Sequence, residues 1–233
     1  MLNWLASLKE DFVQLFYPHL CLGCADENLS ANAIVCPFCF TTLPRTNFAD
    51  IPDNPTAKIF YGRLPIKHAY SEFYFEKDSI IQHLLHQLKY KSKTDIGEYI
   101  GELMGESMST SCRFKDVDAI IAMPLHKAKL KKRGYNQSLF IANGIGRMLG
   151  KPVIENNIER IKNTATQTKK QRDERWQNVA YGFRVKNPES IKNKHLLLVD
   201  DVITTGASIE SCGRALLEVE DVKISVASAA ITV

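Results

Sequence analysis

Two adjacent aspartates, Asp200 and Asp201, stand between a short apolar run and a hydroxyl-rich turn. Carboxylates in this position accept hydrogen bonds from sugar hydroxyls or bind a hard cation such as Mg²⁺, so we assign them the catalytic role. The turn offers backbone N–H groups and hydroxyls to an anion, and the dipole of the helix that follows favours phosphate. The residues assigned to phosphate binding are Thr204, Thr205, Gly206, Ala207 and Ser208. Acids beside such a cradle fit a ribose 5-phosphate.

An ordinary strand–turn–helix connection is the alternative interpretation of this segment. Many doubly wound α/β folds place acids at the end of a strand without binding a sugar phosphate. The order of acids, hydroxyls and glycine favours the ligand-binding interpretation, because each residue type supplies a group that the ligand requires.

A basic segment, 125–137, follows a second apolar run and precedes an apolar helical pattern. A loop between a strand and a helix lies at the carboxyl edge of a parallel sheet, where α/β proteins bind ligands. Basic and amide side chains at that edge donate hydrogen bonds to a pyrophosphate. The donors assigned to it are Lys127, Arg133, Asn136 and Gln137. A solvated basic loop without a ligand is the alternative.

Four of the six cysteines form two Cys-x-x-Cys pairs, Cys21 with Cys24 and Cys36 with Cys39. Two such knuckles supply a closed tetrahedral shell for Zn²⁺ and leave no open position for metal catalysis. We therefore expect a structural zinc that stabilises a segment too small for its own core. A redox-active pair is the alternative, although such pairs accompany a βαβ pattern and do not occur in tandem.

The elements that must hold these groups can be predicted from the apolar spacing. Strands and helices alternate, which favours right-handed crossovers and an α/β fold with a parallel sheet flanked by helices. The expected strands are 69–75, 117–124, 196–199 and 222–233, and the expected helices are 79–90, 96–107, 138–149 and 209–217. The segment 160–183 is polar, basic and poor in aliphatic residues, which is typical of a functional lid.

The net charge is +4, but basic residues are unevenly distributed. Residues 126–175 include 13 lysines or arginines and 4 acidic residues, which suits an anionic ligand or partner. Pyrophosphate and nucleic acid both satisfy that charge. No run approaches the roughly 18 apolar residues of a membrane span, and the N-terminus lacks the basic start of a signal peptide. We expect no stable membrane insertion and a cytoplasmic location.

The run Val-Asp-Asp-Val-Ile-Thr-Thr-Gly, residues 199–206, resembles the 5-phosphoribosyl-1-pyrophosphate (PRPP) motif of type I phosphoribosyltransferases. Because four cysteines near the N-terminus precede this motif, the chain resembles the ComF family of bacterial competence proteins. The other motifs that carry this resemblance are Met123-Pro-Leu-His126, Arg133-Gly-Tyr-Asn-Gln137, and Gln167 with Arg172–Asn178. One departure is Lys169-Lys170-Gln171, where a leucine usually follows the Gln-Thr pair of the family's lid.

The resemblance implies PRPP binding, with Asp200 and Asp201 on the ribose hydroxyls and the 204–208 turn on the 5′-phosphate. It also implies Mg²⁺-dependent release of pyrophosphate as the phosphoribosyl group passes to an acceptor. The lid residues that it implies are Arg160, Gln167, Arg172, Arg175 and Asn178. Two alternatives remain open: a non-catalytic accessory that binds single-stranded DNA or a DNA-uptake helicase, and a PRPP-sensing regulator.

Three parts are expected along the chain. An N-terminal helix and zinc-binding segment occupies 1–44, and a linker or irregular wrap occupies 45–68. A phosphoribosyltransferase domain then follows over 69–233. Within this domain, we expect a hood at 69–110, a core at 117–233 and a lid at 160–178.

Overall fold

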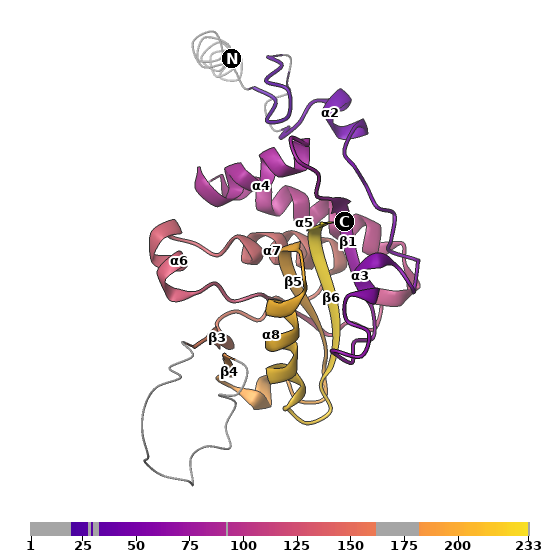
Figure 1. The fold of residues 1–233 in the computed structure, drawn as a ribbon, viewed down its shortest axis with the longest axis vertical. Helices are drawn as coiled ribbons and strands as arrows, with labels where there is room; N and C mark the ends of the chain where they lie inside the picture. Colours follow the sequence, from indigo (N-terminus) through magenta and orange to yellow (C-terminus); the bar gives the residue numbers. More distant parts are fainter. Residues whose placement is uncertain (1–19, 28, 30–32, 92, 162–181, 233) are drawn as a thin grey trace, which may run out of the picture.

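The computed structural model describes residues 20–27, 29, 33–91, 93–161 and 182–232 (Figure 1). Within these residues, one sheet has the strand order β1-β6-β5-β2, and all of its pairings are parallel. Its strands are β1 (Ala69–Tyr74), β2 (Ala119–Ala122), β5 (His195–Ile203) and β6 (Lys223–Ile231). The carboxyl ends of the strands therefore share one edge, and the predicted α/β fold class is confirmed.

Helices cover both faces of this sheet (Figure 1). The described helices are α2 (Pro37–Thr41), α3 (Pro55–Lys58), α4 (Ile80–Tyr90), α5 (Thr94–Ser109), α6 (Lys127–Arg133), α7 (Gln137–Leu149) and α8 (Ala207–Leu217), with 3₁₀ turns at Cys112–Phe114 and Pro188–Ser190. Helices α4, α5 and α7 share one apolar core, whereas α3 and α8 share the other.

The apolar run of β5 contributes to both cores. Leu197 and Val199 belong to the core that contains α5 and α7, whereas Leu196 and Leu198 belong to the core that contains α8. All four side chains are fully buried. A strand covered on both faces has no polar face, which explains why this run is continuous rather than alternating.

Helices α5 and α7 approach each other closely because glycines lie at their contact. A Cβ on Gly101 would lie 2.1 Å from the backbone oxygen of Ile141, and one on Gly144 would lie 2.2 Å from that of Glu98. Arg147 of α7 also pairs with Glu98 of α5, at 2.7 Å. No side chain fits between these two backbones, so the pair forms a tightly packed layer beside the sheet.

The segment 45–68, expected to be a linker or an irregular wrap, packs against the sheet. Arg45 forms an antiparallel bridge with Phe73 of β1, and both Phe60 and Leu64 are buried beneath α8 in its core. A free linker would not contribute such side chains to the core, so the segment is a wrap.

A two-stranded antiparallel ribbon stands beside the main sheet. It consists of β3 (Ile158–Arg160) and β4 (Phe183–Val185), with Arg160 opposite Phe183. Most of the expected lid, including Gln167, Arg172, Arg175 and Asn178, lies outside the described residues.

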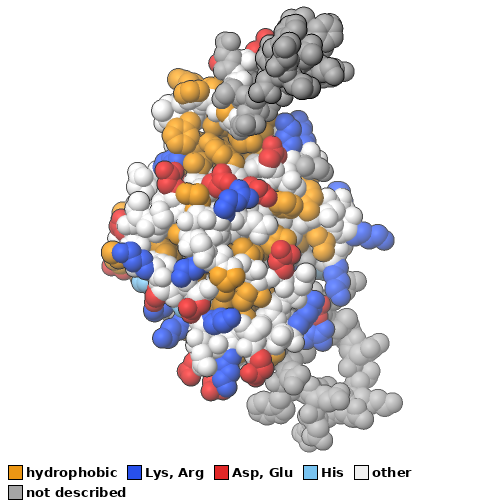
Figure 2. Space-filling view, turned by 180° about the vertical axis from the view of Figure 1, so that it is seen from behind, with side chains coloured by type: hydrophobic (Ala, Val, Ile, Leu, Met, Phe, Trp, Pro, Cys, Tyr) orange, Lys and Arg blue, Asp and Glu red, His pale blue; other side chains and the backbone are white. Residues whose placement is uncertain are grey.

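Hydrophobic side chains gather at the end of the molecule that carries the cysteine segment, while charged side chains of both signs are interspersed over the rest of the visible face (Figure 2). In the cysteine segment, Phe38 is 71% exposed and Phe40 is 41% exposed. Among the described residues, no helix combines the length and the apolar character that crossing a membrane would require.

Candidate functional site

Asp200 and Asp201 lie inside β5, not beyond the end of a strand at Val199. The predicted end of this strand was wrong, because parallel pairing with β6 continues as far as Ile203. The acids nevertheless remain close to the carboxyl edge of the sheet. The hydroxyl-rich turn follows them directly, so the acids and the turn lie at the same edge.

Asp201 is buried and receives several hydrogen bonds. Its Oδ2 atom accepts one from Gln137 Nε2 at 3.0 Å and lies 2.9 Å from the ammonium of Lys89. Its Oδ1 atom accepts a bond from the backbone N–H of Val202 at 2.7 Å. The side chain of Asp201 is therefore held by α4, by α7 and by its own strand.

Asp200 has a different environment. Its Oδ1 atom accepts hydrogen bonds from Ser138 Oγ at 3.1 Å and from the backbone N–H of Asp201 at 2.9 Å. Burial raises the pKa of Asp200 to about 7, and the negative charge of Asp201 acts in the same direction. The two hydrogen bonds and the charge of Lys89 oppose this rise. Asp200 therefore titrates near neutral pH.

The turn after β5 has the backbone geometry of an anion cradle. Gly206 is the N-cap of α8 with φ +71°, and it supplies no side-chain cap for the first turn of the helix. A Cβ on Gly206 would also lie 2.6 Å from Ile59 Cγ2, so close packing and a left-handed backbone both require glycine. The phosphate-binding candidates that surround Gly206 on the surface are Thr204, Thr205, Ala207 and Ser208, all exposed.

Arg63, which no sequence motif indicated, stabilises this turn from the wrap. It donates from Nη1 to the backbone oxygen of Thr205 at 2.8 Å and pairs with Glu210 at 2.7 Å. Glu210 lies in the first turn of α8 and also pairs with Arg214, at 2.9 Å. The two arginines lower the pKa of Glu210 and compensate its charge beside the cradle.

The basic segment contains a short helix, α6, in place of the loop that the sequence predicted. Lys127 is exposed at its start, and the guanidinium of Arg133 lies over the ring of Tyr90, 5.4 Å from the centroid. Asn136 donates to the backbone oxygen of Met123 at 3.0 Å. With Gln137 donating to Asp201, the amide donors assigned to a pyrophosphate have partners within the protein.

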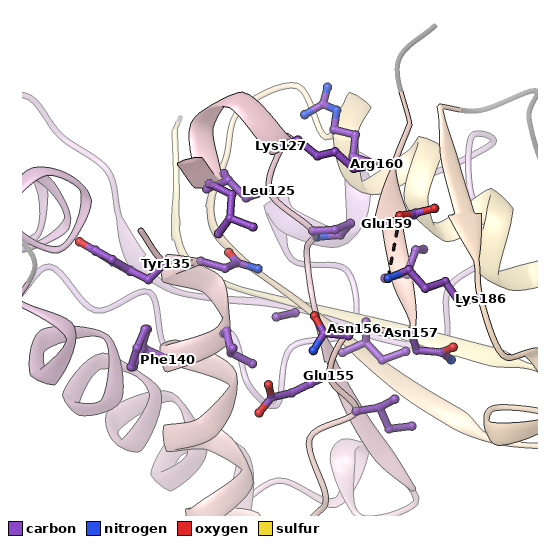
Figure 3. A pocket seen from close by; sticks show the side chains of 18 of the residues that line it. Leu125, Lys127, Tyr135, Phe140, Glu155, Asn156, Asn157, Glu159, Arg160 and Lys186 are labelled. Carbon is purple, nitrogen blue, oxygen red and sulfur yellow. Dashed lines mark ion pairs between the residues drawn. The ribbon is translucent and has the colours of Figure 1, made fainter. Parts of the chain in front are cut away.

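Lys127 and Arg160 line a cavity of about 430 Å³ beside β2 (Figure 3). Its other walls come from α6, from α7 and from residues 154–160. Glu159 faces this cavity and pairs with Lys186 at 3.9 Å. The guanidinium of Arg160 lies over the ring of Phe183, 5.5 Å from its centroid, so this lid candidate is held against the first residue of β4.

Sequence reasoning missed Lys89, Ser138 and Arg63 as members of the site. Ser138 follows Gln137 directly, so its position at the start of α7 was a usable signal. Lys89 and Arg63 carry no such signal, because only the fold brings α4 and the wrap to the edge of the sheet.

The four cysteines of the N-terminal segment lie together, with all four sulfur atoms within 4.8 Å of one another. Cys24 Sγ lies 3.7 Å from Cys36 Sγ, close to the separation of about 3.8 Å that a tetrahedron with Zn–S bonds of about 2.3 Å requires. Burial raises the pKa of Cys21, but hydrogen bonds from backbone N–H groups outweigh burial and bring the pKa to about 6. The donor set and its spacing fit a zinc ion.

Residues 137–232 match the phosphoribosyl transferase domain family. Three curated relatives are similar to this chain. DNA utilization protein YhgH of Salmonella typhi is 29% identical over 58% of this chain and 60% of its own length. Competence protein F of Haemophilus influenzae is 29% identical over 60% of this chain and 64% of its own. Competence protein ComFC of Bacillus subtilis is 33% identical over 42% of this chain and 38% of its own length.

The chain spans less than two thirds of the length of these relatives. Among solved structures, adenine phosphoribosyltransferase from Leishmania tarentolae is similar over 73% of this chain and 71% of its own, with 15% identity and a TM-score of 0.36. The assignment of the fold class rests on the sheet topology and on the matched domain. Residues 137–232 therefore match a phosphoribosyltransferase domain, and the chain is similar to curated DNA utilization and competence proteins.

Proposed function

We propose that the chain binds PRPP and transfers its phosphoribosyl group with release of pyrophosphate. The observation that carries this proposal is the placement of the acid pair and the uncapped start of α8 at one edge of the sheet, joined by a single short turn. Carboxylates at this edge suit a hydroxyl donor and the helix start suits an anionic acceptor, and a ribose 5-phosphate has both.

In this proposal, the residues of the chain bind and orient the ligand. The backbone N–H groups at the start of α8 and the hydroxyls of Thr204 and Thr205 hold the 5′-phosphate. The acid pair lies beside the ribose, and Lys127 and Arg160 provide positive charge beyond β2. Mg²⁺, which the oxygen donors of the acids suit, supplies charge neutralisation for the departing pyrophosphate when it is bound.

The proposal is tested by isothermal titration of the protein with PRPP and Mg²⁺. Binding at micromolar to millimolar PRPP is expected, and the absence of heat up to millimolar PRPP would contradict the proposal. Release of pyrophosphate, screened against a panel of bases and amines, separates an enzyme from a PRPP-sensing regulator. A regulator would bind PRPP and show no release with any acceptor.

Gly206→Ala is expected to weaken PRPP binding by at least about tenfold, because its Cβ would lie 2.6 Å from Ile59 Cγ2 and 3.0 Å from the buried ring of Phe60. The Ile59 methyl is attached to the Cβ atom next to the backbone and the ring is enclosed, so the cradle must shift instead. Gly150→Ala is the matched control. Gly150 also has a left-handed backbone, with φ +63°, but no heavy atom lies within 4 Å of the position that its new methyl would occupy. Both variants place an alanine in a left-handed backbone, so equal PRPP affinities would contradict the cradle assignment.

We also propose that the four cysteines bind one structural zinc ion. Cys39→Ser is expected to lose the zinc that metal analysis detects in the purified protein and to make the segment 20–43 sensitive to protease, since metal binding supplies the folding energy of such segments. Cys112→Ser is the control, because Cys112 is exposed and lies outside the cluster. Retention of one equivalent of zinc by Cys39→Ser would contradict this assignment.

A second candidate function is binding of single-stranded DNA, and α6 is the observation that favours it. This helix buries none of its residues, and no ion pair is found for its lysines among the described residues. Beside it, Tyr90 is 60% exposed, and the guanidinium of Arg133 lies over its ring, so an aromatic and a basic group adjoin the lysines. The names of the relatives, which refer to DNA utilization and competence, agree with this function.

Replacement of Lys129, Lys131 and Lys132 by alanine is expected to weaken binding of single-stranded DNA and to reduce its salt dependence. Fluorescence anisotropy at several salt concentrations measures both. A triple variant of exposed lysines elsewhere, Lys58, Lys115 and Lys223, is the charge-matched control. Equal losses in the two variants would indicate nonspecific attraction, and no loss in the α6 variant would contradict the second function.

The proposed organisation keeps a zinc-binding segment, a wrap, and a phosphoribosyltransferase domain over 69–233. Within that domain the hood of 69–110 is reduced in this proposal to α4 and α5, because β1 is a strand of the main sheet. A cytoplasmic location and a DNA-uptake helicase partner complete the proposal.

A further inference from the structure

Lys89 pairs with Asp201, one of the two acids of the proposed PRPP site. Its ammonium, at the C-terminal end of α4, is 2.9 Å from Asp201 Oδ2, and its side chain is 23% exposed. An ammonium has three N–H donors, and the contact with Asp201 uses one of them. The partial exposure leaves the group accessible from the edge of the sheet.

The end of α4 that carries Lys89 is clamped to the segment before α7. Arg133 lies over the ring of Tyr90, and the hydroxyl of Tyr135 donates to the backbone oxygen of Leu88. Gln137 shares Asp201 Oδ2 with Lys89. The residues on both sides of Lys89 are thus fixed by the same short segment, which holds the ammonium at the acid pair.

The two acids are unequally available to a ligand. Asp201 is 7% exposed, and its two oxygens already receive three donors. The side chain of Asp200 is partly exposed, and both of its hydrogen bonds within the protein end on Oδ1. Among the described residues, no donor is found for Asp200 Oδ2. Asp200 Oδ2 is therefore an acceptor at this edge to which no described residue donates.

We propose that the acids divide their work: Asp200 accepts hydrogen bonds from the bound ribose, whereas Asp201 is a positioning residue that holds Lys89 so that its ammonium donates to an oxygen of the same ligand. This inference rests on the proposed PRPP binding and makes Lys89 a ligand-binding residue. Asp201 then affects the ligand by orienting Lys89, and Gln137 contributes by holding Asp201 in place.

Charge balance supports this division. Two adjacent carboxylates repel each other and repel a ligand that carries phosphate groups. The ammonium of Lys89, placed against Asp201, compensates that charge and gives the ligand a cation. An asparagine at position 201 would retain the packing but would lose the ionic contact that orients the ammonium.

A double-mutant cycle on PRPP affinity tests the proposal. Lys89→Met and Asp201→Asn are each expected to weaken binding by about 10- to 100-fold, and the double variant by no more than the larger of the two single losses. Lys89→Arg should recover part of the affinity. Asp200→Asn should instead add its own loss to that of Lys89→Met. Losses of Lys89→Met and Asp201→Asn that multiply in the double variant would overturn the proposal.

The salt dependence of binding separates an ionic contact from a structural one. Lys89→Met should reduce the dependence of PRPP affinity on salt. Lys223→Met, at the amino end of β6 and away from the site, should not. Unchanged thermal unfolding of the variants is the control for folding. Wild-type affinity and salt dependence in Lys89→Met would overturn the proposal and leave PRPP binding intact.

Nuclear magnetic resonance of ¹³C-methylated lysines distinguishes failure of this inference from failure of the proposed function. The Lys89 signal, identified by its loss in Lys89→Arg, should shift in Asp201→Asn without any ligand and should shift again when wild type binds PRPP. A signal that Asp201→Asn does not move would contradict the positioning role. PRPP that binds without moving the signal would contradict the ligand contact, and wild type that binds no PRPP would contradict the proposed function itself.

Discussion

Asp200→Asn is expected to raise the free energy of unfolding by about 2–4 kcal/mol at pH 8 while removing most of the affinity for PRPP. Burial raises the pKa of Asp200 to about 7, so the folded protein holds a carboxylate at pH 8 that its surroundings disfavour. Asparagine has the same shape and can accept the same hydrogen bond from Ser138. It removes the charge and, with it, the strong acceptor for the ribose.

The pH dependence has a defined sign. The pKa of Asp200 is higher in the folded protein than the ordinary value of 3.8, so this group makes the folded protein less stable as pH rises from about 4 to about 7. The stability difference between Asp200→Asn and wild type should be small near pH 4 and largest above pH 7. Burial also raises the pKa of Glu72 to about 7, but both proteins share that group, so it cancels in the difference.

Urea denaturation at a series of pH values measures the stability difference, and isothermal titration measures PRPP affinity. Asp221→Asn is the matched control, because Asp221 is exposed and lies in a turn before β6. It should change neither quantity appreciably. An Asp200→Asn variant that is no more stable than wild type at pH 8 would show that the carboxylate is not disfavoured in the fold.

Gly101→Ala is expected to lower the free energy of unfolding by at least about 3 kcal/mol. In an ordinary helix interior, this exchange stabilises by up to about 1 kcal/mol, so the expected sign is reversed. The reason is that the new methyl would lie 2.1 Å from the backbone oxygen of Ile141 and 2.9 Å from the Cα atom of Gly144. Backbone atoms cannot rotate away, so α5 and α7 must separate.

Gly213→Ala in α8 is the matched control for this prediction. Its Cβ would meet the end of the Leu64 side chain at 2.6 Å, and a side-chain methyl can move to another position. Urea denaturation should therefore show a much smaller loss for Gly213→Ala than for Gly101→Ala. Equal stabilities of Gly101→Ala and wild type would contradict the close packing of the two helices.

The sequence predicted the sheet and its helices well because the apolar runs are long and continuous. The end of β5 could not be predicted, since aspartates are uncommon in strands and only pairing with β6 keeps Asp200 and Asp201 within one. The short helix α6 was interpreted as a loop, because its many lysines give no buried face by which to recognise it.

The composition of the candidate site was less predictable than its location. The motif residues Asn136 and Gln137 were expected to donate to a ligand, yet both donate to groups of the protein. A motif identifies a side chain but not its partner. Lys89 illustrates the opposite case, because its role depends on a helix far from the motifs in sequence and adjacent to them only in the fold.

The strand order of the sheet has a consequence for the synthesis of the protein. β6 lies between β1 and β5, yet it is made after every other described strand. Until β6 has emerged from the ribosome, β1 has no neighbouring strand in the sheet, and the edge of β5 that pairs with β6 is open. Release before β6 emerges would leave both edges free to pair with other chains, so nascent chains truncated before Lys223 should aggregate and depend on chaperones.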